Sequence, residues 1–205
     1  MPRFSVIIPA HNAENRLSIA VNSVLQQSYK DYELIIICDA CTDDTYRIAS
    51  SLTDKVYVTD YGNDGMARNC GLDHATGDWI LFMDDDDWWL HEFAFSLISR
   101  QIDIWGKGGM DILVFSFIFR YVGLAMPHGN RGYYYPNVWS KCWRREFIGE
   151  HRFQNVFMES DYRFCLDMQK LSPKIICYEQ PLYYYNYMRE GSLTEVASHD
   201  SKTVS

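Results

Sequence analysis

The sequence lacks any long apolar run. Its longest, ILVFSFIF at 112–119, is far shorter than the roughly 20 residues that a membrane-spanning helix needs. The apolar stretch near the N-terminus is likewise too short for a secretory signal. We therefore expect a cytoplasmic protein, with contact at the inner face of a membrane as an open alternative.

Positive charge is scarce as well. Lysine and arginine number 19 against 27 aspartates and glutamates, which gives a formal net charge of −8. Nucleic-acid binding normally requires a basic stripe, so we expect no nucleic-acid partner. A phosphorylated ligand would need positive charge from another source, such as a metal ion.

Glycine-rich phosphate loops and paired cysteine motifs are missing too. Neither G-x-x-x-x-G-K-[ST] nor G-x-G-x-x-G follows the first predicted strand, so phosphates must meet side chains or a metal ion. The six cysteines include one C-x-x-C, at Cys38 and Cys41, with no second such pair to complete a zinc site. We expect free thiols, with a redox pair as the alternative.

Residues 1–90 alternate between two kinds of segment. Continuous apolar runs are typical of strands buried on both faces, and the segments between them carry apolar residues at helical spacing. This alternation predicts one half of a doubly wound α/β sheet. The predicted strands are 4–9, 32–38, 55–59 and 79–83, and the predicted helices are 17–25, 42–52 and 65–74.

Residues 91–205 follow a less regular pattern. The predicted helices are 88–101, 138–147 and 159–170, the predicted strands are 111–121 and 174–187, and the remainder includes a loop at 123–135 and a polar tail at 192–205. The second of these helices carries basic residues that form either a solvated face or a contact with an anionic acceptor or membrane. These residues are Lys141, Arg144 and Arg145.

Polar clusters follow three of the predicted strands, at 10–14, 39–44 and 84–87. In open α/β sheets, ligands bind outside the carboxyl ends of the strands. We therefore expect the functional site at this edge of the sheet.

The four aspartates at 84–87 stand between a buried strand and two tryptophans, so part of the run should pack near the sheet. Packed carboxylates need a cation. A calcium loop would have Gly and Glu where this chain has Trp89 and Phe95. A phosphatase-type nucleophile motif normally follows the first strand, whereas this run follows the fourth. A Mg²⁺ or Mn²⁺ ion shared with substrate phosphates is the interpretation that remains.

Four motifs stand in order along the chain: PAHNAE (9–14), CDACTDDT (38–45), GMARNCG (65–71) and FMDDDD (82–87). In order and spacing they resemble the motifs of the family-2 glycosyltransferases. Looser resemblances follow in VWSKCWRREFI (138–148), SDYRF (160–164) and YYYNYMREGSLT (183–194). The likeness covers nearly the whole chain.

The resemblance implies a GT-A fold, which is a Rossmann-like, doubly wound mixed sheet of mostly parallel strands flanked by helices, with a smaller acceptor-side subregion. Residues 1–90 would form the nucleotide-sugar-binding half of a single domain, and 91–205 its acceptor-binding half. Because the chain is short for this family, a further C-terminal segment carrying membrane contacts or dimerisation stays an open alternative.

The resemblance also implies the activity. We expect metal-dependent, inverting transfer of a sugar from a nucleotide-diphospho-sugar, most readily a UDP-sugar, to a hydroxyl of a saccharide or lipid-linked saccharide. This would serve polysaccharide or glycolipid synthesis, with a homodimer as an open possibility. Two other functions stay open, a non-catalytic nucleotide-sugar-binding module and a metal-dependent nucleotidyltransferase.

Site residues carry over position by position. Asp86 would hold Mn²⁺ or Mg²⁺, although the additional aspartate at position 85 leaves the register open by one residue. Arg68 would contact the nucleotide or diphosphate, or else bridge to one of the aspartates. The expected nucleotide-binding residues are Pro9, Ala10, His11, Glu14, Asp39, Arg68, Asp84 and Asp85.

Asp161 matches the position of the catalytic base, which removes a proton from the acceptor hydroxyl, and Glu159 is its rival. The alternative for Asp161 is an ordinary carboxylate in the first turn of a helix. Residues assigned to the acceptor or diphosphate are Trp139, Arg189 and Ser192. The tryptophans at 88, 89 and 139 either shape the sugar site or pack in the core.

Overall fold

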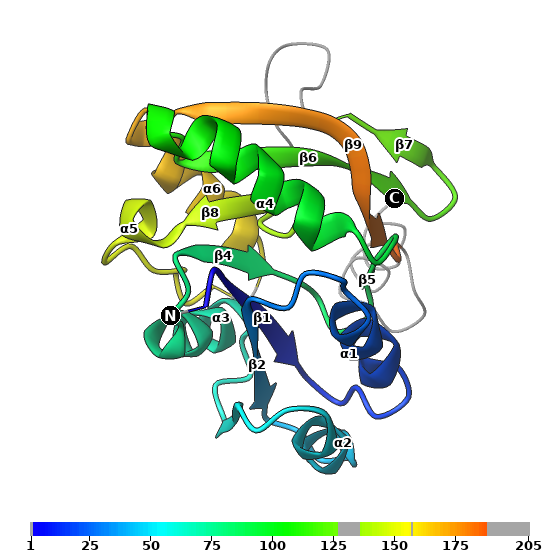
Figure 1. Ribbon diagram of the computed structural model, residues 1–205. Helices are drawn as coiled ribbons and strands as arrows, with labels where there is room; N and C mark the ends of the chain where they lie inside the picture. The colour runs from blue at the N-terminus through cyan, green and yellow to red at the C-terminus, as the bar shows by residue number, and fades with distance from the viewer. Residues whose placement is uncertain (1, 127–135, 157, 188–205) are drawn as a thin grey trace, which may run out of the picture.

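The computed structural model describes residues 2–126, 136–156 and 158–187. In chain order, its elements are β1 (Phe4–Ala10), α1 (Leu17–Leu25), β2 (Tyr32–Asp39), α2 (Thr45–Leu52), β3 (Val56–Thr59), α3 (Asp64–His74), β4 (Trp79–Phe82), β5 (Trp88–Trp89), α4 (Ala94–Trp105), η1 (Gly106–Gly108), β6 (Ile112–Phe119), β7 (Gly123–Ala125), β8 (Lys141–Arg144), α5 (Arg145–Ile148), α6 (Ser160–Lys170) and β9 (Ile175–Tyr185). Figure 1 shows their arrangement.

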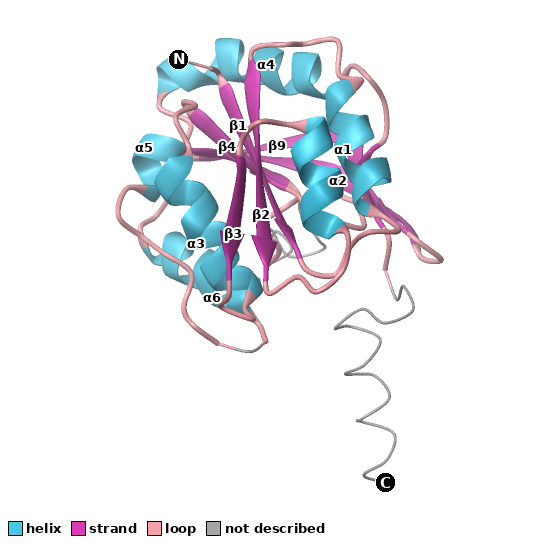
Figure 2. Cartoon of the chain, turned by 90° about the horizontal axis from the view of Figure 1, so that it is seen from below, coloured by secondary structure: helices cyan, strands magenta, loops and turns pink. Residues whose placement is uncertain are grey.

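The described strands form one nine-stranded sheet in the order β3-β2-β1-β4-β8-β6-β9-β5, with β7 paired to β6. The first four strands run parallel, and β8 then joins β4 in the antiparallel sense. Seen end-on in Figure 2, α1 and α2 lie on one side of β1 and β2, and α3 and α6 lie on the other. The predicted doubly wound mixed sheet is therefore confirmed, and it runs through both predicted halves of the chain.

The apolar runs explain why the sheet is covered on both faces. Alternate side chains of a strand point in opposite directions. In β1, Val6 and Ile8 therefore join the core cluster that contains Leu17 of α1, while Ile7 joins the cluster on the α3 side. A helix against only one face would leave half of these side chains in water. The continuous apolar pattern thus selects a three-layer architecture.

Gly71 shows how closely α3 approaches β1. A Cβ atom at this position would lie 2.3 Å from Cγ2 of Ile7, which is far inside van der Waals contact. Only glycine therefore allows this packing distance. The second glycine of the GMARNCG motif is required by helix–sheet packing, which in turn fixes the neighbouring residues of α3 over the carboxyl edge of the sheet.

The predicted helix at 138–147 is wrong. Lys141–Arg144 forms β8, which pairs with β4 and β6, and only the single turn of α5 follows. Cys142 and Trp143 belong to core clusters on opposite faces of the sheet, which is a strand pattern. The prediction of a solvated basic face is also wrong for Lys141, because this side chain is 0% exposed.

The predicted helix at 88–101 begins later than expected. Trp88 and Trp89 form β5 and pair with Tyr184 and Tyr183 of β9, so α4 starts only at Ala94. Trp88 stacks on Tyr184 with ring centroids 4.1 Å apart, and Trp89 is 3% exposed. The packing alternative therefore holds for Trp89. Strand pairing with a segment that lies about a hundred residues later has overridden the local helical pattern.

The other predicted elements agree with the structure where it describes them, except that the start of the predicted loop at 123–135 is a strand paired to β6. The predicted strands at 111–121 and 174–187 are β6 and β9, and α6 matches the helix at 159–170 within one residue. Gly123–Ala125 forms β7, whereas most of the predicted loop at 123–135 and the whole tail at 192–205 lie outside the described residues. All six cysteines are free, and no described helix is long and apolar enough to cross a membrane.

Glu33 joins the amino ends of the strands, opposite the expected site. Its carboxylate accepts hydrogen bonds from Ser5 Oγ at 2.5 Å, Thr76 N at 2.6 Å and Gly77 N at 3.1 Å, and it is paired with Lys55. Burial alone would raise the pKa of Glu33, but the bonds from Lys55, Ser5 and Thr76 outweigh it and lower the pKa to about 2. These contacts therefore stabilise the fold only while the carboxylate is charged.

We predict that Glu33→Gln lowers the free energy of unfolding by about 2–3 kcal/mol at pH 7. Because the folded-state pKa lies below the ordinary value of 4.5, this stabilisation is complete above pH 4.5 and is lost as the pH falls toward 2. Urea unfolding of both proteins at pH 7 and at pH 3 measures the difference. A gap between the two proteins that does not narrow at pH 3 contradicts the prediction.

Candidate active site

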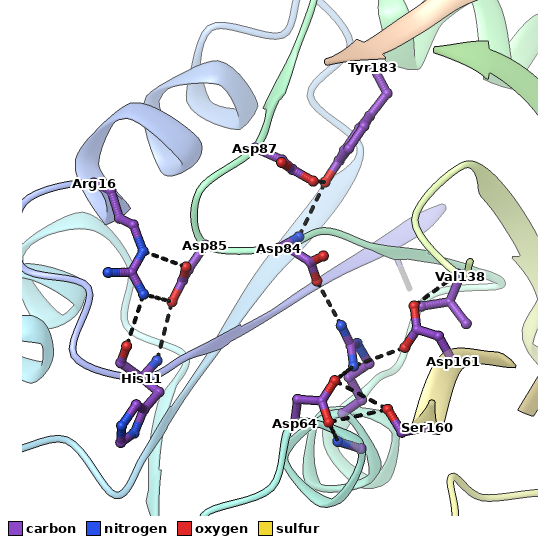
Figure 3. Close-up of polar contacts among 12 residues, drawn as sticks. His11, Arg16, Asp64, Asp84, Asp85, Asp87, Val138, Ser160, Asp161 and Tyr183 are labelled. Carbon is purple, nitrogen blue, oxygen red and sulfur yellow. Dashed lines mark hydrogen bonds and ion pairs between the residues drawn. The ribbon is translucent and has the colours of Figure 1, made fainter. Parts of the chain in front are cut away.

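The carboxyl ends of β1, β2 and β4 meet the first turns of α3 and α6 at one edge of the sheet. Figure 3 shows the polar side chains that gather there. β1 leads into His11, β4 leads into the aspartates at 84–87, and α6 contributes Asp161 in its first turn. The sequence predicted this edge, and the structure places the predicted residues on it.

Arg68 is the centre of this cluster. Its side chain is 4% exposed, and its two terminal nitrogens contact carboxylates from three elements. Nη1 lies 2.5 Å from Oδ2 of Asp64 and 3.0 Å from Oδ1 of Asp161, and Nη2 lies 2.7 Å from Oδ1 of Asp84. Arg68 thus bridges the aspartates, as one of its two predicted roles requires. It holds the proposed base beside the proposed nucleotide-binding carboxylate.

Three carboxylates around one guanidinium leave this site rich in negative charge. Burial raises the pKa of Asp84 to about 7, and repulsion from Asp161 and Asp86 adds to it although Arg68 opposes the shift. Burial also raises the pKa of Asp161, with Asp64 adding to the effect. Carboxylates perturbed in this way are typical of sites that transfer protons or bind cations.

Asp161 is placed as a general base would be. Its Oδ2 accepts a hydrogen bond from Val138 N at 3.2 Å. Its Oδ1 is buried and makes no hydrogen bond within the described part of the chain, although it is ion-paired with Arg68. The rival Glu159 is different, because its side chain is 63% exposed and lies 3.8 Å from Arg163. The geometry favours Asp161.

Asp85 and Asp87 each accept several hydrogen bonds within the protein. Asp85 receives Nε and Nη2 of Arg16 at 2.7 and 2.9 Å and the backbone N–H of His11 at 3.2 Å. Asp87 accepts Tyr183 Oη and Asn186 N, each at 2.8 Å, and is completely buried. These contacts join the aspartate turn to the loop after β1 and to the end of β9.

Asp86, the residue predicted to hold the metal ion, stands between the buried carboxylates of Asp85 and Asp87. It lies half-exposed in the turn and contributes repulsion that raises the pKa of Asp84, Asp85 and Asp87, on each of which burial is the largest influence. A divalent cation at Asp86 would offset that repulsion, and carboxylate oxygens suit Mg²⁺ and Mn²⁺. No group of three or more His, Cys, Asp or Glu residues forms a metal site among the described residues.

The predicted nucleotide residues of β1 and β2 lie together, and two have internal roles as well. His11 is exposed, and its Nδ1 lies 2.8 Å from the carbonyl oxygen of Asp39. The carboxylate of Asp39 accepts the backbone N–H groups of Tyr61 and Asn63 at 2.7 and 2.9 Å and is 4% exposed. Glu14 accepts the N–H of Asp44. Asp39 therefore shapes the loop before α3.

The three residues predicted to contact the acceptor or diphosphate are not brought to this cluster by the described part of the structure. Trp139 is 4% exposed and stacks on Tyr183 with centroids 5.0 Å apart, so it is packed in the core. Arg189 and Ser192 lie outside the described residues. Contact of any of these with an acceptor or diphosphate stays a prediction.

Sequence reasoning missed Arg16 and Asp64. Asp64 stands four residues before Arg68, a spacing at which helical side chains meet, so this pair was detectable from the sequence. Arg16 gave no such signal, because its partner Asp85 is 69 residues away in the chain. The structure alone identifies it as the link between the loop after β1 and the aspartate turn.

Solved structures of glycosyltransferases share this fold. TarS from Staphylococcus aureus in complex with UDP-GlcNAc superposes with a TM-score of 0.80 over 95% of this chain and 61% of that one, at 22% identity. Glucosyl-3-phosphoglycerate synthase from Mycobacterium tuberculosis, solved with Mn²⁺, UDP and phosphoglyceric acid, gives 0.65 over 99% and 76%, at 18% identity. The expected GT-A fold is therefore confirmed.

Sequence comparison identifies the family to which the chain belongs. An uncharacterized glycosyltransferase of Haemophilus influenzae is 31% identical over 87% of this chain and 76% of its own length. GlyA of Streptococcus pneumoniae is 25% identical over 95% of this chain, which spans only 32% of that relative. Residues 5–166 match the family model described as Glycosyl transferase family 2. The chain belongs to this family.

Proposed function

We propose that this protein transfers a sugar from a nucleotide-diphospho-sugar to a hydroxyl group of a saccharide or lipid-linked saccharide. One observation carries the proposal: Arg68 holds Asp84, at the end of the central strand β4, next to Asp161 in the first turn of α6. A carboxylate for the donor and a base for the acceptor thus share one guanidinium. Transfer requires the donor and the acceptor hydroxyl to be bound next to each other, which this arrangement supports.

The proposed reaction is a single displacement with inversion. Oδ1 of Asp161 accepts the proton of the acceptor hydroxyl while the hydroxyl oxygen attacks the anomeric carbon. The bond from that carbon to the diphosphate oxygen breaks on the opposite face, through a transition state with oxocarbenium character. A divalent ion at Asp86, when bound, would neutralise the departing diphosphate. Arg68 keeps Asp161 oriented throughout and remains protonated.

A UDP-sugar is the donor we favour. A relative from Escherichia coli, WfaP, is named as a UDP-Glc:alpha-D-GlcNAc-diphosphoundecaprenol beta-1,3-glucosyltransferase and is 38% identical over half of this chain. TarS was solved with UDP-GlcNAc. These names support a uridine donor and are compatible with a lipid-linked acceptor. Mn²⁺ in the mycobacterial structure supports a divalent ion, and membrane contact and a homodimer stay predictions.

The two other functions explain less of the site. A non-catalytic binding module has no need of a base, yet Oδ1 of Asp161 is buried beside Arg68 and makes no hydrogen bond among the described residues. A nucleotidyltransferase normally has a loop bearing glycine and lysine after its first strand, and residues 10–14 contain neither. The transferase proposal is the one that uses Asp161.

A donor screen tests the proposal. We expect UDP release from one or more UDP-sugars in the presence of Mn²⁺ or Mg²⁺, with hydrolysis or a saccharide as acceptor, and loss of release in EDTA. GDP-sugars serve as the matched controls. Tight UDP binding without turnover of any donor would favour the binding module, and turnover in EDTA would remove the metal from the proposal.

A further inference from the structure

Lys141 is a fully buried lysine on β8, which is rare for this residue type. Its Nζ donates to the backbone oxygen of Asn137, and Oδ1 of Asn137 and Oγ of Ser140 each lie 3.4 Å away. An ammonium group has three donors and no acceptor, so a shell of oxygen acceptors suits its charged form. Lys141 therefore closes the turn at 137–141 from the inside.

This turn carries the amide that contacts Asp161. The N–H of Val138 donates to Oδ2 of Asp161 at 3.2 Å, and the carbonyl of Val138 accepts from Nε1 of Trp143 at 3.1 Å. Oγ of Ser140 donates to Oδ1 of Asn137 at 2.5 Å, which stiffens the same turn. The position of the Val138 amide thus depends on contacts that Lys141 helps to make.

Lys141 also acts on Asp161 through its charge. Burial and Asp64 raise the pKa of Asp161, whereas Arg68, the Val138 amide and Lys141 lower it. Burial lowers the pKa of Lys141 itself to about 8, so the ammonium predominates at pH 7. The charged or titratable groups that face Asp161 are Arg68 and Asp64 of α3, Asp84 after β4, Lys141 of β8 and Cys165 of α6.

We propose that Lys141 is a positioning residue for Asp161: its buried ammonium closes the turn that presents the Val138 amide and helps to keep the Asp161 carboxylate charged. This inference rests on the proposed function, in which Asp161 is the base. Lys141 touches no reacting atom. It acts on the reaction by way of Val138 and the local electrostatic field.

Two neutral variants separate the contributions of the turn and the charge. Lys141→Gln loses the charge but keeps a donor for the Asn137 carbonyl, whereas Lys141→Met loses both. We expect the acidic limb of the kcat profile to move to higher pH in both, so that the ratio of variant to wild-type kcat falls by about threefold to tenfold between pH 8 and pH 5.5. At pH 8, Lys141→Met should be slower than Lys141→Gln, because only the glutamine holds the turn.

Lys55→Met is the matched control, because it also removes a lysine charge near a carboxylate, that of Glu33, but at the opposite end of the sheet. Its acidic limb should coincide with that of the wild type. Neutral variants of Lys141 that lose activity equally at every pH, or that match the wild-type profile, overturn the proposal. If Lys141→Met does not fold, Lys141→Arg decides, because it must retain the wild-type limb.

A titration that needs no substrate separates this inference from the proposed function. The ¹³C-carboxyl resonance of Asp161, assigned with Asp161→Asn, should titrate at higher pH in Lys141→Gln than in the wild type. If that shift occurs in a protein that transfers no sugar, the proposed function fails and the link between Lys141 and Asp161 stands. If transfer occurs and the resonance does not shift, the inference fails alone.

Discussion

Replacing Asp161 by asparagine should lower kcat for sugar transfer by about 10²–10⁴-fold, the range expected when a general base is lost. Asparagine has nearly the same shape and keeps an oxygen for Arg68 or the Val138 amide, so the cluster should remain folded. It cannot take the proton of the acceptor hydroxyl. UDP affinity, measured by calorimetry with Mn²⁺ present, should stay within about threefold of the wild type, because Asp161 is not expected to touch the nucleotide.

Asp64→Asn is the natural comparison, because Asp64 also pairs with Arg68 but has no role in proton transfer. We expect this variant to keep transfer within about tenfold of the wild type. Comparable losses in both variants would mean that the ion-pair cluster, and not the base, limits the rate. An active Asp161→Asn together with an inactive Glu159→Gln would move the base to Glu159, despite the exposure of that side chain.

The first half of the fold could be predicted because the sequence pattern within each segment identifies it as a strand or a helix. Each strand from β1 to β4 is a continuous apolar run, and both faces of such a run need cover. The helices between them carry apolar residues at helical spacing, and Gly71 marks the close approach of α3. No partner from a distant part of the chain is needed to interpret these segments.

The wrong helix at 138–147 and the late start of the helix at 88–101 both involve segments whose strand partners are distant in the sequence. β5 is a strand because Trp88 and Trp89 pair with Tyr184 and Tyr183. β8 is a strand because it pairs with β4 on one side and with β6 on the other. In a short segment rich in aromatic residues, the apolar positions fit both the helical and the strand repeat, so the pattern alone does not decide between helix and strand. Lys141 was interpreted as solvated for the same reason, since the prediction placed it on a helix.

The motifs located the site, but they did not show which aspartates are engaged by the protein. Asp64 and Arg68 are four residues apart and were detectable, whereas Arg16 with Asp85 and Tyr183 with Asp87 join segments 69 and 96 residues apart. Those two pairings join Asp85 to the loop after β1 and Asp87 to the end of β9, while Asp84 pairs with Arg68.

The different contacts of the four aspartates predict different effects on UDP binding when these residues are replaced one at a time. Asp86→Ala should weaken UDP binding in Mn²⁺ by about 30- to 300-fold, because a metal clamp on a diphosphate is worth several kcal/mol. Without the ion, the variant and the wild type should bind UDP equally weakly. Calorimetry of both proteins in Mn²⁺ and in EDTA makes the comparison directly.

Asp85→Asn and Asp87→Asn are the matched controls within the same turn. Asp85→Asn breaks a charge pair with Arg16. It should therefore lower the melting temperature, while its effect on metal-dependent UDP affinity should be small compared with that of Asp86→Ala. Burial raises the pKa of Asp87 well above its usual range. Asparagine keeps an oxygen that can accept from Tyr183 Oη or Asn186 N, so it is a close substitute. A loss of metal-dependent binding in Asp85→Asn or Asp87→Asn, with Asp86→Ala unaffected, would shift the metal ligand by one position.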